Sequence, residues 1–199
     1  MSDLDRWEQR FSAEGYVFGT EPNTFLTSQA HLLHPGMSVL AVADGEGRNG
    51  VWMAQRGLDV HAVDFSPTAL AKARALADEC GVTIRTELAD LRHWDWPHEA
   101  YDAVAAIFVQ FTPPAARDRM FEGMKRALRP DGVLLIEGYG VKQLEYSTGG
   151  PKDIAHLYTR ELLEAAFGDF AELTIREYDA ELDEGTRHVG KSALVDLVG

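Results

Sequence analysis

The chain has 199 residues, of which 45% are hydrophobic and 26% charged, an ordinary composition for one soluble globular domain. Its formal net charge of −13 repels polyphosphate and anionic lipid, so we expect neither nucleic acid nor a membrane as a partner. The sequence has no apolar stretch of about 18 residues that would span a membrane. A single cysteine and a charged N-terminus without a secretory signal lead us to expect a cytoplasmic protein.

The first 36 residues are expected to form a helical and aromatic segment ahead of the main fold. Apolar residues at helical spacing predict a short helix over residues 3–13. The aromatic loop YVFGTEPNTFL follows, and a second short helix is expected after it. We expect Tyr16 and Phe18 of this loop to fold over a bound ligand as a lid, with simple packing against the first helix as the alternative.

From residue 37 to residue 198, strand-like and helix-like segments alternate. Strands are expected at 39–43, 59–64, 82–86, 101–109, 133–137, 170–182 and 188–198, and helices at 47–56, 66–80, 112–128 and 159–167. The last two strands are joined by a short turn, which predicts an antiparallel hairpin. This order predicts one α/β domain over residues 1–199, built on a doubly wound, seven-stranded, mostly parallel sheet with a reversed final strand.

A glycine-rich turn, ADGEGRNG at residues 43–50, connects the first strand to the next helix. In doubly wound sheets, ligands bind at this edge of the first strand. Gly45 and Gly47 let the backbone approach a ligand, and the helix N-terminus offers free N–H groups. Asp64 ends the second strand, where a carboxylate can accept both hydroxyls of a ribose. The pattern predicts a cofactor that contains adenosine.

The turn leaves alternatives open, because GEGRNG also satisfies the G-x-G-x-x-G fingerprint of dinucleotide-binding folds. An NAD-binding oxidoreductase is one alternative, although such enzymes normally use a second domain to bind substrate. A catalytically silent cofactor-binding domain is another.

Several motifs together resemble the class I S-adenosylmethionine-dependent methyltransferases over about residues 37–198. They are VLAVADGEGRNG, the acid Asp64, the Ala-Asp-Leu turn at residues 89–91 and LRPDG before the fifth strand. YVFGTEPNTFL and TGGPKDIAHLYT resemble, more narrowly, the small-molecule enzymes related to the tellurite-resistance and thiopurine methyltransferases. The resemblance implies methyl transfer from S-adenosyl-L-methionine to a small-molecule acceptor, such as a thiol, a chalcogen oxyanion or another small nucleophile.

The resemblance also implies a set of cofactor-binding residues along one edge of the sheet. They are Ala43, Asp44, Gly45, Gly47, Asn49, Asp64, Phe65, Ser66, Asp90, Leu91, Ile107 and Phe108, with Tyr16 and Phe18 as the lid. Family members usually carry an acid where this chain has Ala41 and a glycine where it has Ala43. We therefore expect Asp44 to supply the negative charge that faces the cofactor's ammonium group.

Candidate catalytic residues are Tyr139 and His156, in or beside a long glycine-bearing loop, and His188 at the start of the last strand. The chain lacks the Asn/Asp-Pro-Pro-aromatic motif after the fourth strand that is typical of enzymes acting on nucleobases. Its histidines and its one cysteine show no metal-ligand spacing, so no metal is expected. Nothing in the sequence indicates the oligomeric state.

Overall fold

The fold is organised around a seven-stranded sheet with the strand order β3-β2-β1-β4-β5-β7-β6. The computed structural model describes residues 2–146 and 148–199. Its strands are β1 (Ser38–Val42), β2 (Asp59–Asp64), β3 (Arg85–Leu88), β4 (Tyr101–Ile107), β5 (Leu128–Tyr139), β6 (Thr174–Glu184) and β7 (His188–Val198). β1 to β5 pair in parallel, and β7 runs antiparallel between β5 and β6. The predicted doubly wound sheet with a reversed final strand is confirmed.

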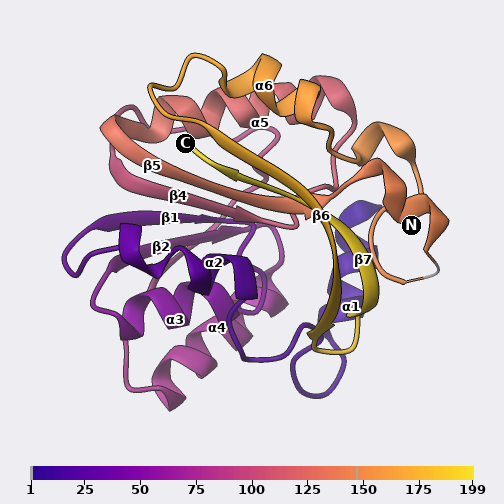
Figure 1. Cartoon of the computed structure of the whole chain (residues 1–199). Helices are drawn as coiled ribbons and strands as arrows, with labels where there is room; N and C mark the ends of the chain where they lie inside the picture. Colours follow the sequence, from indigo (N-terminus) through magenta and orange to yellow (C-terminus); the bar gives the residue numbers. More distant parts are fainter. Residues whose placement is uncertain (1, 147) are drawn as a thin grey trace.

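Helices cover both faces of this sheet (Figure 1). They are α1 (Asp3–Phe11), α2 (Thr24–Ser28), α3 (Arg48–Gln55), α4 (Pro67–Glu79), α5 (Pro114–Ala127) and α6 (Arg160–Phe167), with short 3-10 turns η1 (Ala30–Leu32), η2 (Val141–Glu145) and η3 (Ile154–His156). α5 and α6 lie on one face, and α3 and α4 on the other. Local capping defines the helix starts, as at α4, where the Ser66 hydroxyl accepts a hydrogen bond from Ala69 N at 3.0 Å.

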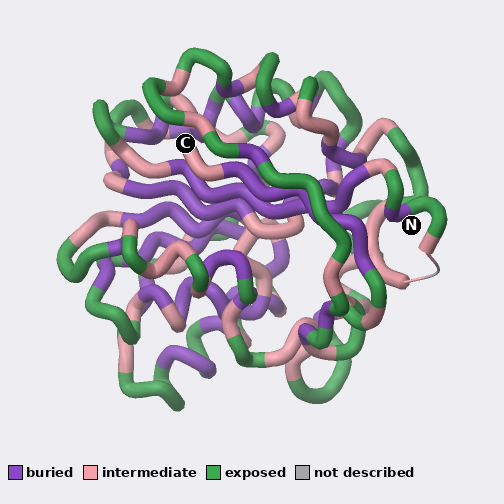
Figure 2. The backbone as a smooth tube through the Cα atoms, in the orientation of Figure 1, coloured by how far each residue is buried: buried purple, intermediate pink, exposed green. Residues whose placement is uncertain are grey.

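Two apolar cores form because the central strands are buried on both faces. Side chains alternate along β1, so Leu40 and Val42 join the core under α5, whereas Val39 and Ala41 join the core under α3 and α4. Burial of each large apolar side chain contributes about 1.5–3 kcal/mol. Figure 2 shows this burial along the inner strands, whereas the edge strand β6 is largely exposed.

Some details differ from the sequence-based expectations. β3 begins at Arg85 rather than residue 82, because Val82 N still bonds to Ala77 O at the end of α4. The stretch 138–158, expected as one loop, contains η2, η3 and a bridge between Gly140 and Tyr158. Apolar periodicity predicts that Cys80 lies on the buried face of the helix, and this is wrong: Cys80 caps α4, past the last inward position, and is exposed.

The N-terminal segment is fastened to two separate parts of the fold. Glu8 of α1 accepts hydrogen bonds from the Ser66 hydroxyl and, at 2.6 Å, from the Thr68 hydroxyl at the start of α4. At the other side, Thr186 N in the β6–β7 turn donates to Val17 O at 2.9 Å. α1 accordingly lies beside the ends of β6 and β7 (Figure 1). Within the described residues, no helix has the length and apolarity required to cross a membrane.

Candidate functional site

A hollow opens at the carboxyl ends of β1, β2 and β4, where the direction of the strand order reverses. The turns after β1 and β2 contribute Ala43, Asp44, Gly45, Glu46, Arg48, Asn49, Asp64 and Phe65. The turns after β3 and β4 contribute Ala89, Asp90, Leu91, Arg92, Ile107, Phe108 and Phe111. Its remaining lining comes from the N-terminal segment and from the hairpin, through Asp3, Trp7, Phe11, Phe18, Gly19 and His188.

Two of the lining residues hold a backbone conformation that side chains rarely adopt. Ala43 has φ 49° at the end of β1, and Phe108 has φ 57° at the end of β4. A left-handed conformation costs a residue with a side chain about 1–2 kcal/mol. Both residues turn the chain sharply at the rim of the hollow, which is typical of strain retained at a binding site.

Asp44 lines this hollow and has one carboxylate oxygen without a hydrogen-bond partner among the described residues. Its Oδ1 accepts a hydrogen bond from Gly50 N at 3.1 Å, while its Oδ2 is buried and has no partner among the described residues. Burial raises the pKa of Asp44 to about 7, and the nearby Asp64 carboxylate adds to that rise. A side chain at Gly50 would collide with Oδ2, so glycine is required beneath the carboxylate. The group is suited to receive a cation.

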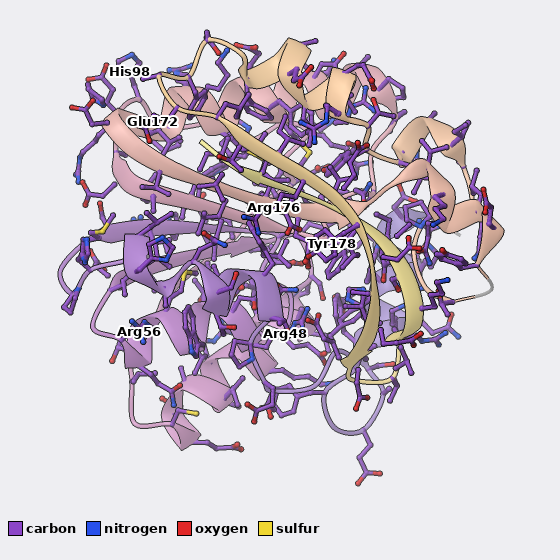
Figure 3. The ribbon with its side chains drawn as sticks, viewed as in Figure 1. Arg48, Arg56, His98, Glu172, Arg176 and Tyr178 are labelled. Carbon is purple, nitrogen blue, oxygen red and sulfur yellow. The ribbon has the colours of Figure 1, made fainter. Side chains whose placement is uncertain are left out.

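Arg48 provides the opposite charge on the same turn. Its Nη2 donates to Glu184 Oε2 at 2.7 Å, and both side chains are buried. Its Nη1 is buried without a partner in the described part of the chain. Figure 3 places Arg48 at the end of α3 that faces the β6–β7 hairpin. One hollow is thus lined by two residues of opposite charge, and each has a buried polar atom without a partner in the described part of the chain, which fits a zwitterionic ligand.

Asp64 is held in place by the backbone of the turns around it. Its Oδ2 accepts a hydrogen bond from Gly45 N at 3.0 Å, and its Oδ1 accepts one from Ser66 N at 2.9 Å. Burial raises its pKa to about 6 despite these hydrogen bonds. Each oxygen keeps a further lone pair, so the carboxylate retains the capacity to accept from the hydroxyls of a ribose.

Asp90 has a partner that was not predicted. Arg92 binds it in a bidentate pair, with Nε 2.8 Å from Oδ1 and Nη2 2.8 Å from Oδ2. These hydrogen bonds lower the pKa of Asp90, so the carboxylate is ionised. Arg92 also lies 3.4 Å from Asp3 of α1, which links this side of the hollow to the N-terminal segment.

Aromatic rings of the N-terminal segment line the hollow. The rings of Trp7 and Phe11 stack with centroids 5.3 Å apart, and Phe18 packs against both at 6.3 Å. Phe11 lies directly over Gly45, at 3.6 Å from the place where a Cβ would stand. Farther along, Phe65 and Phe111 are nearly parallel, with centroids 6.4 Å apart. These surfaces are suited to a planar heterocycle.

A second hollow adjoins the first, and all three predicted catalytic residues line it: Tyr139, His156 and His188. Phe108 and His188 belong to both hollows, and their ring centroids are 4.2 Å apart. Burial lowers the pKa of His188, and the Arg48 and Arg10 charges lower it further, so the imidazole is neutral at pH 7. Its Nδ1 lies 3.9 Å from Glu184 Oε2, beyond hydrogen-bond distance. Burial raises the pKa of Tyr139, whose hydroxyl is therefore protonated.

Most of the predicted cofactor residues meet in the first hollow, but three do not line it. Gly47 has φ 91° and packs closely against Ala73, so its lack of a side chain serves the contact between α3 and α4. Ser66 is buried as the cap of α4. Tyr16 lies against Lys72, whose Nζ is 5.9 Å from its ring, rather than over the hollow.

Sequence reasoning missed several lining residues. Trp7 and Phe11 share one face of α1 in the sequence, but nothing local indicates which part of the fold that face covers. Arg92 and Phe111 lie in the turns that follow β3 and β4. Their place after a strand end is the sequence signal that could have identified them.

The comparisons with known proteins agree with this geometry. A methyltransferase-domain family model matches residues 39–132. A phosphatidylethanolamine N-methyltransferase from Cereibacter sphaeroides is 34% identical over 139 residues, which are 68% of this chain and 68% of that protein. Among solved structures, TehB from Haemophilus influenzae superposes with a TM-score of 0.70 at 17% identity over 98% of this chain and 65% of that one. Magnesium protoporphyrin IX methyltransferase from Synechocystis PCC 6803, with bound SAH, superposes with a TM-score of 0.64 at 18% identity, over 98% of this chain and 92% of that one.

The fold is thus the Rossmann-like methyltransferase fold, with its hollow at the switch between β1 and β4. The chain belongs to the class I S-adenosylmethionine-dependent methyltransferases. It is an enzyme that transfers a methyl group, and its cofactor is S-adenosyl-L-methionine rather than NAD. The unpaired groups of Asp44 and Arg48 fit the zwitterionic end of that cofactor.

Proposed function

We propose that the enzyme methylates a small-molecule acceptor that binds in the second hollow. One observation carries the proposal: Phe108 and His188 line both hollows, so the acceptor and the cofactor would meet there. Phe108 directly follows β4, where its left-handed φ of 57° turns the chain at the rim of the first hollow. An acceptor enclosed by Tyr139, His156 and His188 would be a small molecule rather than a polymer.

The first hollow would hold the cofactor along its length. Asp44 Oδ2 would receive the ammonium group and Arg48 Nη1 the carboxylate, since both atoms are buried without other partners in the described residues. Asp64 would accept from the ribose hydroxyls. Phe65, with Phe111 opposite, would pack against the adenine ring.

When bound, S-adenosylmethionine supplies an electrophilic methyl group, so positioning the acceptor provides much of the rate. His188, neutral at pH 7, would accept a proton from an acceptor that must lose one. Tyr139 would donate a hydrogen bond but would not act as a base, because its hydroxyl stays protonated. The aromatic segment from Trp7 to Phe18 would exclude water from the junction.

The test is methyl transfer from labelled S-adenosylmethionine to a panel of thiols, chalcogen oxyanions, small amines and phenols. Phosphatidylethanolamine vesicles belong in the panel, because one relative carries that substrate in its name. We expect turnover of at least one small acceptor, and loss of turnover in a His188→Gln variant that still binds S-adenosylhomocysteine. Methylation of the vesicles alone would contradict the proposal.

A further inference from the structure

The mouth of the second hollow is cationic on a protein whose formal net charge is −13. Arg6, Arg10, Lys152 and Arg187 line it, and Asp153 is the one acid among its lining residues. We propose that the methyl acceptor is an anion, a small carboxylate or phosphate that Arg10 and Arg187 bind at this mouth. The inference rests on the proposed function, because it names the acceptor class for the same hollow.

Arg10 and Arg187 have no acidic partner in the described part of the chain. Neither takes part in an ion pair or a side-chain hydrogen bond there, whereas Arg6 pairs with the exposed Asp3 at 2.8 Å. Burial lowers the pKa of Arg10, and repulsion from Arg187 and Arg6 lowers it further. Three guanidinium groups therefore gather at a cost in free energy that a bound anion would offset.

The position of Arg10 leaves its hydrogen-bonding edge available. Its guanidinium lies over the ring of Trp7, 4.3 Å from the centroid, which fixes the plane of the group without using its N–H donors. A planar guanidinium held in this way matches the two oxygens of a carboxylate or phosphate. Trp7 also lines the cofactor hollow, so the anion site stands next to the place of transfer.

The inner end of the hollow carries unpaired polar atoms instead of charge. Tyr139 Oη and His188 Nδ1 are buried without hydrogen-bond partners among the described residues. Buried polar atoms of this kind are normally satisfied by a ligand or by water. An acceptor with its anionic group at the arginines would direct its nucleophilic atom towards Tyr139 and His188.

The chain offers a matched control in Arg56. This arginine also stacks on a tryptophan, Trp52, with its guanidinium 5.1 Å from the ring centroid. Figure 3 shows that Arg48 and Arg56 lie at opposite ends of α3, with Arg56 on the side away from the hairpin. Arg56 lines neither hollow, so its loss removes an equivalent charge without touching the proposed site.

The test is a titration of the full chain, saturated with S-adenosylhomocysteine, with sodium phosphate and separately with sodium acetate at constant ionic strength. Calorimetry should show saturable binding of at least one anion, and the stronger of the two identifies the acceptor as a phosphate or a carboxylate. Arg10→Gln combined with Arg187→Gln should weaken that binding about tenfold or more. Arg56→Gln should leave it unchanged, and Arg10→Lys should weaken it less than Arg10→Gln.

The same variants separate the two proposals. Wild-type thermal midpoints and S-adenosylhomocysteine affinity in the double variant would show that its fold and cofactor site are intact. The anion site is overturned if the protein binds S-adenosylhomocysteine but binds neither anion saturably. It is also overturned if Arg56→Gln weakens anion binding as much as the double variant. In both cases the proposed function stands. If S-adenosylhomocysteine does not bind, the proposed function fails, and this inference fails with it.

Discussion

Asp44 accepts a hydrogen bond from Gly50 N at 3.1 Å with one carboxylate oxygen, while its second oxygen is buried and has no partner among residues 2–146 and 148–199. Gly50 belongs to the first turn of α3, so the helix start holds the carboxylate in place. In the proposed site, Asp44 would supply the negative charge that faces the ammonium group of the cofactor. Its raised pKa gives two predictions.

Binding of S-adenosylhomocysteine should strengthen as the pH rises. The pKa of Asp44 is about 7 without ligand, so at pH 6 most of the protein must lose a proton before the carboxylate can receive an ammonium group. We expect affinity to increase about tenfold between pH 6 and pH 8 and then level off. Calorimetry across this range measures the effect.

Methylthioadenosine, which lacks the amino-acid part, is the control ligand for this prediction. Asp64, with a pKa of about 6, would face the nucleoside part that both ligands share in the proposed site, so the difference between their pH profiles isolates Asp44. An Asp44→Asn variant should lose most of its affinity for S-adenosylhomocysteine and keep its affinity for methylthioadenosine. Equal losses for the two ligands would show that Asp44 does not face the ammonium group.

The same substitution should stabilise the cofactor-free protein at alkaline pH. The pKa of Asp44 rises from 3.8 to about 7 on folding, so the folded state holds the proton more tightly than the unfolded state. Its contribution to stability is therefore present at low pH and is lost as the pH rises from about 4 to 7. Asp44→Asn should raise the free energy of unfolding at pH 8 by on the order of 2 kcal/mol, with little gain at pH 4. Urea denaturation of the wild type and the variant at the two pH values measures the effect. A lower free energy of unfolding for Asp44→Asn at pH 8 would refute the prediction.

The substitutions Ala43→Gly and Ala41→Gly should have different effects on the free energy of unfolding. Ala43 has φ 49°, so Ala43→Gly relieves a left-handed strain that offsets the greater entropy of glycine in the unfolded chain. We expect no loss of stability, or a gain of up to about 1 kcal/mol. Ala41 is buried in the middle of β1, and Ala41→Gly should cost about 1 kcal/mol. If Ala43→Gly lost as much stability as Ala41→Gly, the left-handed conformation of Ala43 would carry no cost in free energy.

Removing the hydrogen bonds that join α1 to α4 should speed release of the cofactor. Glu8 joins α1 to the N-terminus of α4 through hydrogen bonds from Ser66 and Thr68, an end that favours a negative charge. Glu8→Ala should raise the dissociation rate of S-adenosylhomocysteine about tenfold, as expected for the loss of charge-assisted hydrogen bonds. Stopped-flow measurements give the rate, with the exposed Glu14→Ala as the control. Unchanged release in Glu8→Ala would mean that the segment does not close the site.

Local patterns in the sequence were sufficient to predict the fold. The period of apolar residues, the glycine and proline turns and the hairpin at the C-terminus indicated the seven-stranded sheet with its reversed strand. The same signals failed where tertiary pairing decides the boundary. β5 starts at Leu128, before the predicted turn, because Leu128 pairs with Tyr101 across an irregular register.

The sequence by itself determined the sheet, the glycine turn and the acids that follow β1, β2 and β3, because turn chemistry and strand ends are properties of neighbouring residues. Only the tertiary structure decided how those acids are paired, since the unpaired oxygen of Asp44 and the pairing of Asp90 with Arg92 depend on burial and contact. It also decided that residues of α1 line the hollow and that Arg10 and Arg187 both line the second hollow beside it. Arg10 and Arg187 lie far apart in the chain. They come together because the loop after α1 packs against the β6–β7 turn, where Thr186 N donates to Val17 O, a contact that no local pattern encodes.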